Sequence, residues 1–422
     1  MLERINVLVV GGGGREHALA WKINQSLLCG DLFIAPGNAG TAKIGKNIDI
    51  PVMDFPALAA FAKEHNAFTV VGPDDPLAAG IVDYFHEQGL FILGPTKKAA
   101  QIESSKVLSK QLMDVAKIPT AAYSTFSEYD EALMHVVGDL SDIPLVIKAS
   151  GLALGKGSYI CHTLEEKRAA LKAIMVERVH GDAGNQVVIE ELLEGSEISA
   201  HALVAGADIF PFPFVQDHKH ALDGNRGPMT GGMGTVGPID LDQGSTCAII
   251  ARAVRGMESV HAPFSGLLFP GLMLTTDGPK VLEFNARFGD PETQVLMRLM
   301  MGDFLALLVA TATGNLDKVD AFIYPGYAAN IVMCSGGYPD KYEKGYPIEG
   351  VSEAEKIPGV VVFHAGTAMK DGQLVTNGGR VLGVSAVGDT LQDAIDTAYA
   401  AVDCIHFNGK YFRRDIGQYI PV

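Results

Sequence analysis

The first hundred residues alternate short apolar runs with amphipathic segments, and this alternation constrains the fold more than any other feature of the chain. The runs "INVLVV", "LFIA", "FTVVG" and "LFILG" have the length of buried strands, and helix-like patterns such as "REHALAWKINQSLL", "FPALAAFAKEH" and "PLAAGIVDYFHEQ" lie between them. Strands that alternate with helices form parallel, doubly wound sheets. We therefore predict an α/β chain that begins with such a sheet.

Each of these predicted strands ends in a turn rich in glycine or proline: "GGGG", "PGNAG", "GPDDP" and "GPT". Such turns lie along the carboxyl edge of a parallel sheet, where doubly wound folds bind ligands. The first turn does not have the spacing of a dinucleotide site, because Glu16 or His17 stands where G-x-G-x-x-G requires its third glycine. This spacing disfavours NAD. A glycine turn before a helix N-terminus still suits a phosphate, and Arg15 adds a positive charge; the alternative is a tight turn without a ligand.

The remainder of the chain mixes predicted strands with helices. Residues 186–193 and 197–206 have the pattern of a strand pair, and Thr163 and Glu166 have the spacing of a capping box at the start of a helix. Further predicted elements are a helix over 97–116, strands over 143–150 and 158–163, a helix over 163–179, and a β-rich block from about 316 that ends in a helix over 390–405. The apolar run 295–314 contains Arg298 and Asp303, so we predict a buried helix there and not a membrane span.

Composition excludes some functional classes. The net charge of −16 argues against a nucleic-acid backbone as the main partner. The five cysteines are scattered and none forms a C-x-x-C pair, so we expect neither a zinc site nor a disulfide framework. Free thiols, together with an N-terminal segment that lacks the pattern of a signal peptide, favour a cytoplasmic location.

The stretch "VIKASGLALGKGS" carries the first sign of phosphate chemistry. Lys148 lies near the end of an apolar run, and Lys156 lies in the glycine-rich loop that follows. A glycine-rich hairpin with a lysine can fold over phosphate groups and donate backbone N–H groups to them. It is not a P-loop, because it is one residue short of that spacing and a strand follows instead of a helix. The alternative is an ordinary mobile hairpin.

The stretch "KVLEFNARFGDPE" combines carboxylate, amide and guanidinium groups. Residues two apart in a strand share a face, so Glu283 and Asn285 can present two oxygen atoms together, which suits Mg²⁺. Arg287 continues the same spacing and can stabilise charge on a phosphoryl group during its transfer. Asp290 and Glu292 follow at once. A polar series on an otherwise apolar strand is difficult to explain as packing.

Two more segments contain candidate binding residues. Glu190, Glu191 and Glu197 surround the end of an apolar run, where carboxylates can accept hydrogen bonds from an adenine amino group or a ribose hydroxyl; the alternative is a solvated strand end. The segment 215–238 is long, polar and rich in glycine, and it contains Asp217 and Lys219. Loops of this length in compact proteins are usually functional or disordered.

In this order the motifs resemble the ATP-grasp enzymes and, among them, the glycinamide ribonucleotide synthetase (phosphoribosylamine–glycine ligase) family. The resemblance covers nearly the whole chain and is carried by "GGGGREHALAW", "APGNAGTA", "GPDDPLAAGIVD", "GPTKKAAQIESSK", "VIKASGLALGKG", "VIEELLEGSEIS", "QDHKHALDGNRGPMTGGMG", "KVLEFNARFGDPETQ" and "VFHAGT…NGGRVL". It implies an N-terminal α/β substrate-binding domain over 1–102, an ATP-grasp region over 103–315 with a mobile lid at about 120–190, and a small β-rich domain over 316–422.

The resemblance also implies an activity: glycine is joined to 5-phosphoribosylamine with ATP, through a glycyl phosphate, in de novo purine biosynthesis. The cofactor would be Mg²⁺ or Mn²⁺, and the partners would be these small molecules, with no nucleic acid and no membrane, for a monomer or weak homodimer. Two alternatives remain: an ATP-grasp ligase for a different acid or amine, and a catalytically silent nucleotide-binding protein.

The resemblance assigns the nucleotide side of the site residue by residue. Lys106 and Lys148 would contact the ATP phosphates, and Lys156 with Gly155 and Gly157 would form the lid loop. Glu190, Glu191 and Leu193 would bind adenine, and Glu197 would bind the ribose. Glu283 and Asn285 would bind the metal ion.

The substrate side follows in the same way. The residues implied in catalysis are Arg287, Asp290 and Lys148. Those implied in substrate binding are Gly11, Gly12, Gly13, Gly14, Arg15, Gly37, Asn38, Asp74, Asp217 and Lys219. The chain departs from the family pattern at Ser150, where Asp is usual, at Met229, where Asn is usual, and at His220, where Arg is usual.

Overall fold

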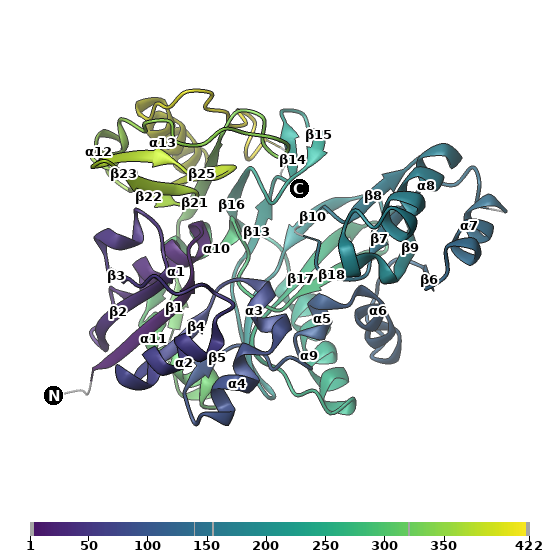
Figure 1. Cartoon of the computed structure of the whole chain (residues 1–422), viewed down its shortest axis with the longest axis horizontal. Coiled ribbons are helices and arrows are strands. Elements are labelled where there is room, and N and C mark those ends of the chain that lie inside the picture. Colours follow the sequence, from purple (N-terminus) through teal and green to yellow (C-terminus); the bar gives the residue numbers. More distant parts are fainter. Residues whose placement is uncertain (1–3, 139, 154–155, 320, 419–422) are drawn as a thin grey trace.

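The structure, a computed structural model, describes residues 4–138, 140–153, 156–319 and 321–418. Its larger sheets are an N-terminal sheet of five strands, an antiparallel sheet of four and an antiparallel sheet of ten. In Figure 1 the N-terminal sheet lies at the lower left, the four-stranded sheet projects to the right, and the C-terminal part of the chain lies at the top.

The N-terminal sheet is parallel, as the alternation of strands and helices predicts. Its strand order is β3-β2-β1-β4-β5, so the chain crosses from one side of β1 to the other, and ligands bind doubly wound folds at such a crossover. The elements are β1 (Ile5–Gly11), α1 (Gly14–Ile23), β2 (Cys29–Pro36), β3 (Lys46–Asn47), α2 (Phe55–Glu64), β4 (Ala67–Val71), α3 (Asp74–Ala79), α4 (Ile81–Glu87) and β5 (Ile92–Leu93).

Two helices predicted as continuous are each broken in two. Gly80 separates α3 from α4 with a φ of +101°, a left-handed conformation that favours glycine. The predicted helix over 97–116 is divided into α5 (Gln101–Ser104) and α6 (Lys106–Val115). Ser105 between them is extended, and its hydroxyl accepts a hydrogen bond from the Leu108 N–H. Ser105 therefore acts as the N-cap of α6.

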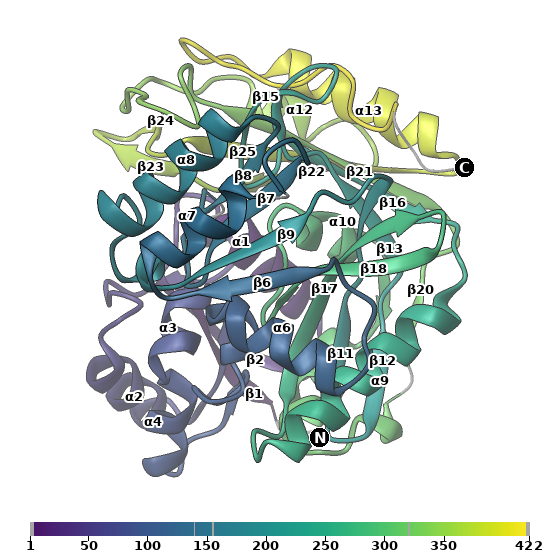
Figure 2. The ribbon, with the colours of Figure 1, turned by 90° about the vertical axis from the view of Figure 1, so that its right-hand side faces the viewer.

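The four-stranded sheet has the order β6-β9-β7-β8 and packs against two helices on one face. Figure 2 looks onto this sheet, with α7 and α8 on its near side. Thr163 and Glu166 form the predicted capping box at the start of α8. The elements are β6 (Tyr123–Phe126), α7 (Tyr129–Val137), β7 (Leu145–Ala149), β8 (Ser158–Cys161), α8 (Leu164–Leu171) and β9 (Val187–Glu191).

The ten-stranded sheet joins the middle of the chain to its C-terminal part. Its order is β12-β11-β17-β10-β13-β16-β21-β25-β22, with β18 paired to β17, so β16 links the C-terminal strands to the central ones. The strands are β10 (Ser196–Ser199), β11 (Ala202–Ala205), β12 (Asp208–Pro211), β13 (Phe214–Asp217), β16 (Gly234–Ile239), β17 (Ser265–Thr275), β18 (Gly278–Asn285), β21 (Tyr327–Cys334), β22 (Val360–His364) and β25 (Arg380–Gly388).

The predicted strand pair formed by residues 186–193 and 197–206 is wrong. β9 pairs with β6 and β7 in the four-stranded sheet, whereas β10 pairs with β13 and β17 in the ten-stranded sheet. Gly195, with a φ of +153°, lies between the two strands. The short connection therefore carries the chain from one sheet to the other instead of closing a hairpin.

The remaining elements are short hairpins and the helices that cover the large sheet. The apolar run 295–314 forms two helices, because Asp303 caps a second helix by accepting a hydrogen bond from the Ala306 N–H. These elements are β14 (His220–Leu222), β15 (Arg226–Met229), α9 (Gln243–Ser259), α10 (Glu292–Leu299), β19 (Met300–Gly302), α11 (Phe304–Ala312), β20 (Ala321–Ile323), α12 (Val351–Ala354), β23 (Thr367–Lys370), β24 (Gln373–Thr376) and α13 (Leu391–Cys404).

A shared hydrophobic core fixes the N-terminal sheet against the large sheet. Val7 and Ile34 from the parallel sheet belong to the same buried cluster as Leu296 of α10 and Phe304 of α11. Burial of apolar surface on this scale is the main stabilising term in folding. The carboxyl edge of the parallel sheet is therefore held beside the start of α10. In the parts of the chain described above, none of the helices has the length and apolar character needed to span a membrane.

Candidate active site

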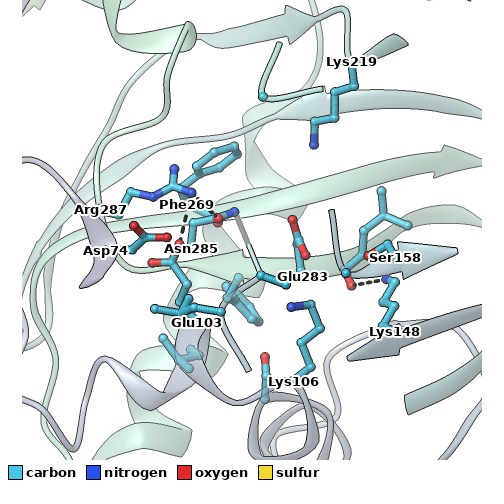
Figure 3. A pocket seen from close by; sticks show the side chains of 18 of the residues that line it. Asp74, Glu103, Lys106, Lys148, Ser158, Lys219, Phe269, Glu283, Asn285 and Arg287 are labelled. Carbon is cyan, nitrogen blue, oxygen red and sulfur yellow. Dashed lines mark hydrogen bonds and ion pairs between the residues drawn. The ribbon is translucent and has the colours of Figure 1, made fainter. Parts of the chain in front are cut away.

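A deep pocket lies where α6, the four-stranded sheet, β17–β18 and the segment after β13 meet. It encloses about 1200 Å³ of space not filled by protein atoms, part of which is open solvent. The sequence-predicted residues that line it are Asp74, Lys106, Lys148, Gly157, Asp217, Lys219, Glu283, Asn285, Arg287 and Asp290. Figure 3 shows most of these side chains directed toward one shared space.

Glu283 lies at the centre of this pocket, between lysines from different elements. In Figure 3 its carboxylate lies between the ammonium groups of Lys106 and Lys219. Burial alone would raise the pKa of Glu283, but the nearby charges of Lys106, Lys219, Lys148 and Arg287 together hold this pKa below its ordinary value. Glu283 is therefore an anion with lysine side chains on either side of it.

The strand that carries Glu283 and Asn285 contains a β-bulge. Glu283 pairs with Gly271 and Val281 pairs with Leu272, so Leu282 is the additional residue. A bulge changes the direction of the side chains that follow it. Both Glu283 and Asn285 line the pocket, as their spacing predicts.

Arg287 reaches the same place from beyond the strand. β18 ends at Asn285, so the prediction that Arg287 continues the strand is wrong. Its guanidinium nevertheless donates a hydrogen bond to Oδ1 of Asn285 at 2.9 Å and forms an ion pair with Glu103 at 3.1 Å. Burial would lower the pKa of Arg287, but Glu103 and neighbouring carboxylates raise it. The loop after β18 thus holds a fixed positive charge beside Asn285.

Lys148 and Lys110 share one buried carboxylate. Both ammonium groups form ion pairs with Glu190 of β9, the one from Lys110 at 2.6 Å, and each of the three side chains is at least nine-tenths buried. Burial would raise the pKa of Glu190, but Lys148 and Lys110 hold it below its ordinary value. Lys148 also donates to the carbonyl of Leu282 in the bulge, at 3.3 Å. These contacts tie α6 and the four-stranded sheet to β18.

Ser150 joins the end of β7 to the start of α6. Its carbonyl accepts from the Lys106 N–H at 2.8 Å, and its hydroxyl accepts from the Val107 N–H at 3.2 Å. These are free N–H groups of the first helical turn, which require partners. The serine at this departure from the family pattern therefore acts as a second cap of α6, outside the pocket lining.

Asp290 marks the end of the pocket nearest the N-terminal sheet. It forms an ion pair with Arg380 of β25 at 3.2 Å and accepts a hydrogen bond from Gln294 at 2.9 Å. Burial would raise the pKa of Asp290, but Arg380 and Arg15 hold it below its ordinary value. Asp290 therefore connects the loop after β18 to the C-terminal strands.

Packing accounts for much of the four-glycine turn. A Cβ atom on Gly12 would lie 2.6 Å from the carbonyl oxygen of Gly37, and one on Gly14 would lie 2.6 Å from Nε2 of Gln294. Gly11 has a φ of +128°. Gly11, by its conformation, and Gly12, by its contact with backbone, require glycine whether or not a ligand binds, so the glycine run alone does not distinguish a tight turn from a phosphate cradle.

The same turn adjoins the Asp290 end of the pocket. A Cβ on Gly13 would lie 3.5 Å from Oδ2 of Asp290. Glu16 accepts hydrogen bonds from the Gly13 N–H and from the Arg15 guanidinium, both at 2.6 Å. Arg15 also donates to the carbonyl of Phe288 at 3.2 Å. The turn, Arg15 and the loop after β18 are therefore neighbours.

Asn38 lies behind this turn and has a full set of hydrogen bonds. Its amide nitrogen donates to the carbonyls of Gly12 and His364, at 3.0 and 2.8 Å, and its side-chain oxygen accepts from the Gly40 and Thr41 N–H groups. Asn38 thus fastens the N-terminal sheet to β22. Asp74, at the start of α3, lines the pocket on the side of Arg287.

Asp217 and Lys219 also line the pocket. Lys219 forms an ion pair with Glu197 of β10, whose carboxylate raises the pKa of Lys219 in spite of burial. Met229 lines it as well, whereas His220 lies outside the lining and its Nδ1 contacts the carbonyl of Gly227 at 3.0 Å.

The other predicted nucleotide residues lie outside the pocket lining. Glu191 accepts from the Ala122 N–H at 3.1 Å, and Leu193 follows β9 on the way to β10. Lys156 donates to the carbonyl of Pro339 at 3.0 Å, and this contact joins the loop between β7 and β8 to the C-terminal part of the chain. Gly155 lies outside the described residues.

Sequence reasoning missed several residues of this site: Glu103, Lys110, Phe269 and Arg380. Lys106 and Lys110 are four residues apart, a spacing that places both side chains on one face of a helix, so Lys110 could have been predicted from the sequence as a neighbour of Lys106. Glu103 and Arg380 carried no such signal, because their partners lie 184 residues away in Arg287 and 90 residues away in Asp290.

The pocket and the sheets around it define a class of protein. A four-stranded antiparallel sheet opposite a larger one, with buried lysines on one side and the Glu283–Asn285 pair on the other, is the arrangement of an ATP-grasp ligase. Sequence profiles agree. The N domain of phosphoribosylglycinamide synthetase matches residues 5–103, its ATP-grasp (A) domain matches 104–293, and its C domain matches 328–419. The chain belongs to the phosphoribosylglycinamide synthetase family, and several of its curated relatives are named phosphoribosylamine–glycine ligase.

Individual relatives support this assignment over the full length. A phosphoribosylamine–glycine ligase of Pseudomonas aeruginosa is 46% identical, with 98% of this chain and 97% of the relative covered. The crystal structure of the phosphoribosylamine–glycine ligase of Thermotoga maritima superposes with a TM-score of 0.86 at 35% identity, over 97% of this chain and 100% of that one. The biotin carboxylase domain of a Hydrogenobacter thermophilus 2-oxoglutarate carboxylase shares the fold alone, with a TM-score of 0.72 at 17% identity over 96% and 91% of the two chains.

Proposed function

We propose that this protein joins glycine to 5-phosphoribosylamine, with ATP converted to ADP and phosphate, to give glycinamide ribonucleotide in purine biosynthesis. The observation that supports it most directly is the convergence of Lys106, Lys148, Glu283, Asn285 and Arg287 on one pocket, in a chain of this family. These groups provide the charge pattern needed to activate a carboxylate with a nucleoside triphosphate.

The chemistry proceeds in two displacements. An oxygen of the glycine carboxylate attacks the γ-phosphorus of ATP, the bond to the β-phosphate oxygen breaks, and ADP leaves with that electron pair. The amine of phosphoribosylamine then attacks the carbonyl carbon of glycyl phosphate, phosphate leaves, and the amine nitrogen loses a proton. Activation is necessary because a free carboxylate has no adequate leaving group, and the protein contributes positioning and charge stabilisation.

We assign the nucleotide to the side of the pocket between α6 and the four-stranded sheet. Lys106 and Lys148 contact the phosphates, and the loop containing Lys156 and Gly157 covers them. The adenine meets Glu190 and the backbone of Glu191 and Leu193, and Glu197 holds the ribose. Support comes from Glu190 and Lys148, which lie within one buried cluster, and from Glu197, whose ion-pair partner Lys219 lines the pocket.

The residues present fit a divalent cation. Glu283 is held in its anionic form and Asn285 offers an amide oxygen two residues away, and both are the hard oxygen donors that Mg²⁺ prefers. Among the described residues no three His, Cys, Asp or Glu side chains are placed to hold a metal ion by themselves, so Glu283 and Asn285 would hold it together with oxygen atoms of the nucleotide. When bound, the cation neutralises charge on the phosphates. The Hydrogenobacter neighbour is a complex with MgADP, and Mn²⁺ has the same donor preference.

We assign the phosphoribosylamine to the opposite end. The turn from Gly11 to Gly14, with Arg15, Gly37 and Asn38, borders its phosphate, and Asp74, Asp217 and Lys219 border the amine and ribose. Arg287 and Asp290 act where glycine and the γ-phosphoryl group meet. The nearness of Gly13 to Asp290, where a Cβ added to Gly13 would lie 3.5 Å from Oδ2 of Asp290, supports placing the glycine turn next to this end of the pocket.

The test is ADP formation with glycine and freshly prepared phosphoribosylamine, each omitted in turn. We expect ADP release at full rate only with both substrates present. Rapid release with another acid in place of glycine would instead indicate a ligase of different specificity, and bound but unsplit ATP would indicate a silent nucleotide-binding protein.

The variant Glu283→Gln tests the metal assignment. Loss of the anionic donor is expected to raise the Mg²⁺ concentration needed for half-maximal activity by about 10- to 100-fold, in line with the loss of a charged ligand. The measurement is a Mg²⁺ titration at saturating ATP and glycine. Glu258→Gln, which changes an exposed glutamate of α9 far from the lining, is the matched control. An unchanged titration in Glu283→Gln would remove Glu283 from the metal site.

A further inference from the structure

A second cavity lies where the N-terminal sheet meets the C-terminal strands. α1 packs against β22 at this junction (Figure 1), and the short 3₁₀ helix Thr41–Lys43 lies beside α1. The cavity encloses about 490 Å³ of space not filled by protein atoms, part of which is open solvent, and none of its lining residues lines the larger pocket. Its lining combines apolar side chains with two histidines, a lysine and a glutamate.

β22 is an edge strand and turns backbone groups toward this cavity. The His364 N–H donates to Nδ1 of His17 at 2.8 Å, and the His364 carbonyl accepts from the Asn38 side chain at 2.8 Å. Both backbone groups of His364 therefore point away from β25. Residues two apart in an antiparallel edge strand direct their backbone groups to the same side, so the N–H and C=O of Val362 point away from β25 as well. Val362 lines the cavity, and among the described residues neither of these two groups has a hydrogen-bond partner.

His17 presents a donor of fixed direction to the same cavity. Its Nδ1 accepts the His364 N–H, so in the neutral ring the proton lies on Nε2. Burial lowers the pKa of His17 to about 3, so this neutral form is the one present at pH 7. Of the two charged residues in the lining, Lys43 is the one whose charge lowers the pKa of both His17 and His364, so its ammonium group lies near both rings.

The His364 side chain has an unsatisfied nitrogen in this lining. It is 1% exposed, and its Nε2 has no hydrogen-bond partner in the part of the chain that the structure describes. Its Nδ1 contacts the Thr367 hydroxyl at 3.1 Å. Because a hydroxyl can donate or accept, Nε2 of His364 can take either role. A buried polar atom without a partner is costly, and a ligand in the cavity removes that cost.

We propose that this cavity binds inorganic phosphate through the His17 imidazole, the Lys43 ammonium group and the backbone of Val362. The phosphate oxygens accept hydrogen bonds from Nε2 of His17, from Lys43 and from the Val362 N–H. The N–H and C=O of one residue lie side by side on an edge strand, so the same ion reaches both, and a P–OH group donates to the Val362 carbonyl.

The mixture of donors and an acceptor selects among anions. Inorganic phosphate keeps at least one P–OH group at neutral pH, whereas sulfate has none and a phosphate monoester has largely lost its own. Either of those ions would place an oxygen lone pair against the Val362 carbonyl, which leaves a buried acceptor unpaired. The site therefore distinguishes phosphate from sulfate, although the two ions have nearly the same size and shape.

This proposal goes beyond the proposed reaction, which takes place in the other pocket. Asn38 already joins Gly12 to the His364 carbonyl at this junction. A phosphate ion that contacts α1, Lys43 and β22 adds a second link beside Asn38. Binding to the folded protein alone also stabilises it, so the melting temperature is expected to rise with phosphate concentration.

The only tryptophan of the chain makes the test specific to this cavity. Trp21 lines it, and its ring lies against Phe363, with 5.7 Å between ring centroids. The full-length protein is titrated with sodium phosphate at pH 7 and constant ionic strength, while Trp21 emission is recorded and calorimetry measures the heat of binding. We expect saturable binding of phosphate, with sulfate and AMP weaker by about 10-fold or more.

The titration is repeated with a non-hydrolysable ATP analogue at saturation, which occupies the proposed nucleotide site. We expect the phosphate midpoint to stay within about 2-fold, because independent sites do not compete. Loss of the phosphate response under these conditions would place the ion in the larger pocket and overturn the proposal. Equal midpoints for phosphate and sulfate would also overturn it, since they would indicate general attraction of anions. So would the absence of both an emission change and a heat of binding.

Two variants test the contacts. Lys43→Ala is expected to raise the phosphate midpoint by about 3- to 10-fold, as for the loss of one charged contact at an exposed position. Lys46→Ala, which removes an exposed lysine outside the lining, is the matched control and is expected to leave the midpoint unchanged. His364→Phe keeps a ring of similar size without Nε2, and we expect a rise of about 3- to 10-fold. Circular dichroism checks that each variant is folded, and an unchanged midpoint in both folded variants would contradict the proposal.

Discussion

Replacement of Arg287 by alanine is expected to lower kcat by about 10²–10³, the usual effect of removing one group that stabilises transition-state charge. Arg287 is fixed against Asn285 and Glu103, and it lines the pocket opposite the lysines of α6 and β7. It lies outside the proposed adenine and ribose contacts, so the dissociation constant of an ATP analogue is expected to change by less than a few fold. Steady-state turnover and calorimetric binding measure the two quantities separately.

The ion pair with Glu103 complicates this variant and also provides its control. Glu103 is buried, and its other oxygen accepts a hydrogen bond from the Ala286 N–H at 2.7 Å. Removing Arg287 leaves this carboxylate unpaired, at a cost of about 3–5 kcal/mol when it stays ionised. The double variant Arg287→Ala with Glu103→Gln is therefore expected to recover stability without recovering turnover. Recovery of turnover in the double variant would assign Arg287 a structural role only.

Local patterns in the sequence predict local structure well in this chain. The alternation of apolar runs and helices predicts the parallel sheet, and the two-residue spacing of Glu283 and Asn285 places both side chains in the pocket. These predictions succeed because side-chain direction in a strand repeats every two residues, whatever the partner strand. The predicted capping box of α8 is also confirmed, because both of its members lie within one helical turn and no distant segment is needed to form it.

Predictions failed where distant segments decide the structure. The closeness of β9 and β10 in the sequence led to the prediction that they pair with each other. In the structure β9 pairs with β6 and β10 pairs with β17, in two different sheets. The helix breaks at Gly80 and Ser105 each depend on a single residue. The amphipathic pattern continues through both positions, so it predicts one helix where the structure has two. Arg380 becomes part of the site only because β25 joins the large sheet through β21.

The four-glycine turn is an instructive intermediate case. Its composition suggests phosphate binding, yet the left-handed conformation of Gly11 and the close approach of Gly12 to the Gly37 backbone already require glycine. Two physical demands, tight packing and access of backbone to a ligand, select the same residue. The position of Gly13 beside Asp290 supports the ligand interpretation, and this position depends on the tertiary fold.

Glu190→Gln is expected to destabilise the protein by about 3–5 kcal/mol at pH 7, because it leaves two buried ammonium groups without their counter-ion. Lys110 and Lys148 reach Glu190 from α6 and β7, so the cluster links the nucleotide side of the pocket to the four-stranded sheet. Lys110 keeps a hydrogen bond to the Thr120 hydroxyl at 2.7 Å, and Lys148 keeps one to the Leu282 carbonyl at 3.3 Å. Neither contact replaces a carboxylate.

The pH dependence identifies electrostatics as the cause. The pKa of Glu190 is lower in the folded protein than in the unfolded chain, where it is about 4.3. Its contribution to stability is therefore fully present above about pH 4.3 and is lost as the pH falls through the lower folded-state value. Unfolding in urea, followed by circular dichroism, should show the wild-type advantage over Glu190→Gln shrinking under acidic conditions. Glu191→Gln, on the same strand but partly exposed, is expected to change stability by less than about 0.5 kcal/mol. A gap between wild type and Glu190→Gln that stays constant down to acid pH would mean that packing, and not charge, maintains this cluster.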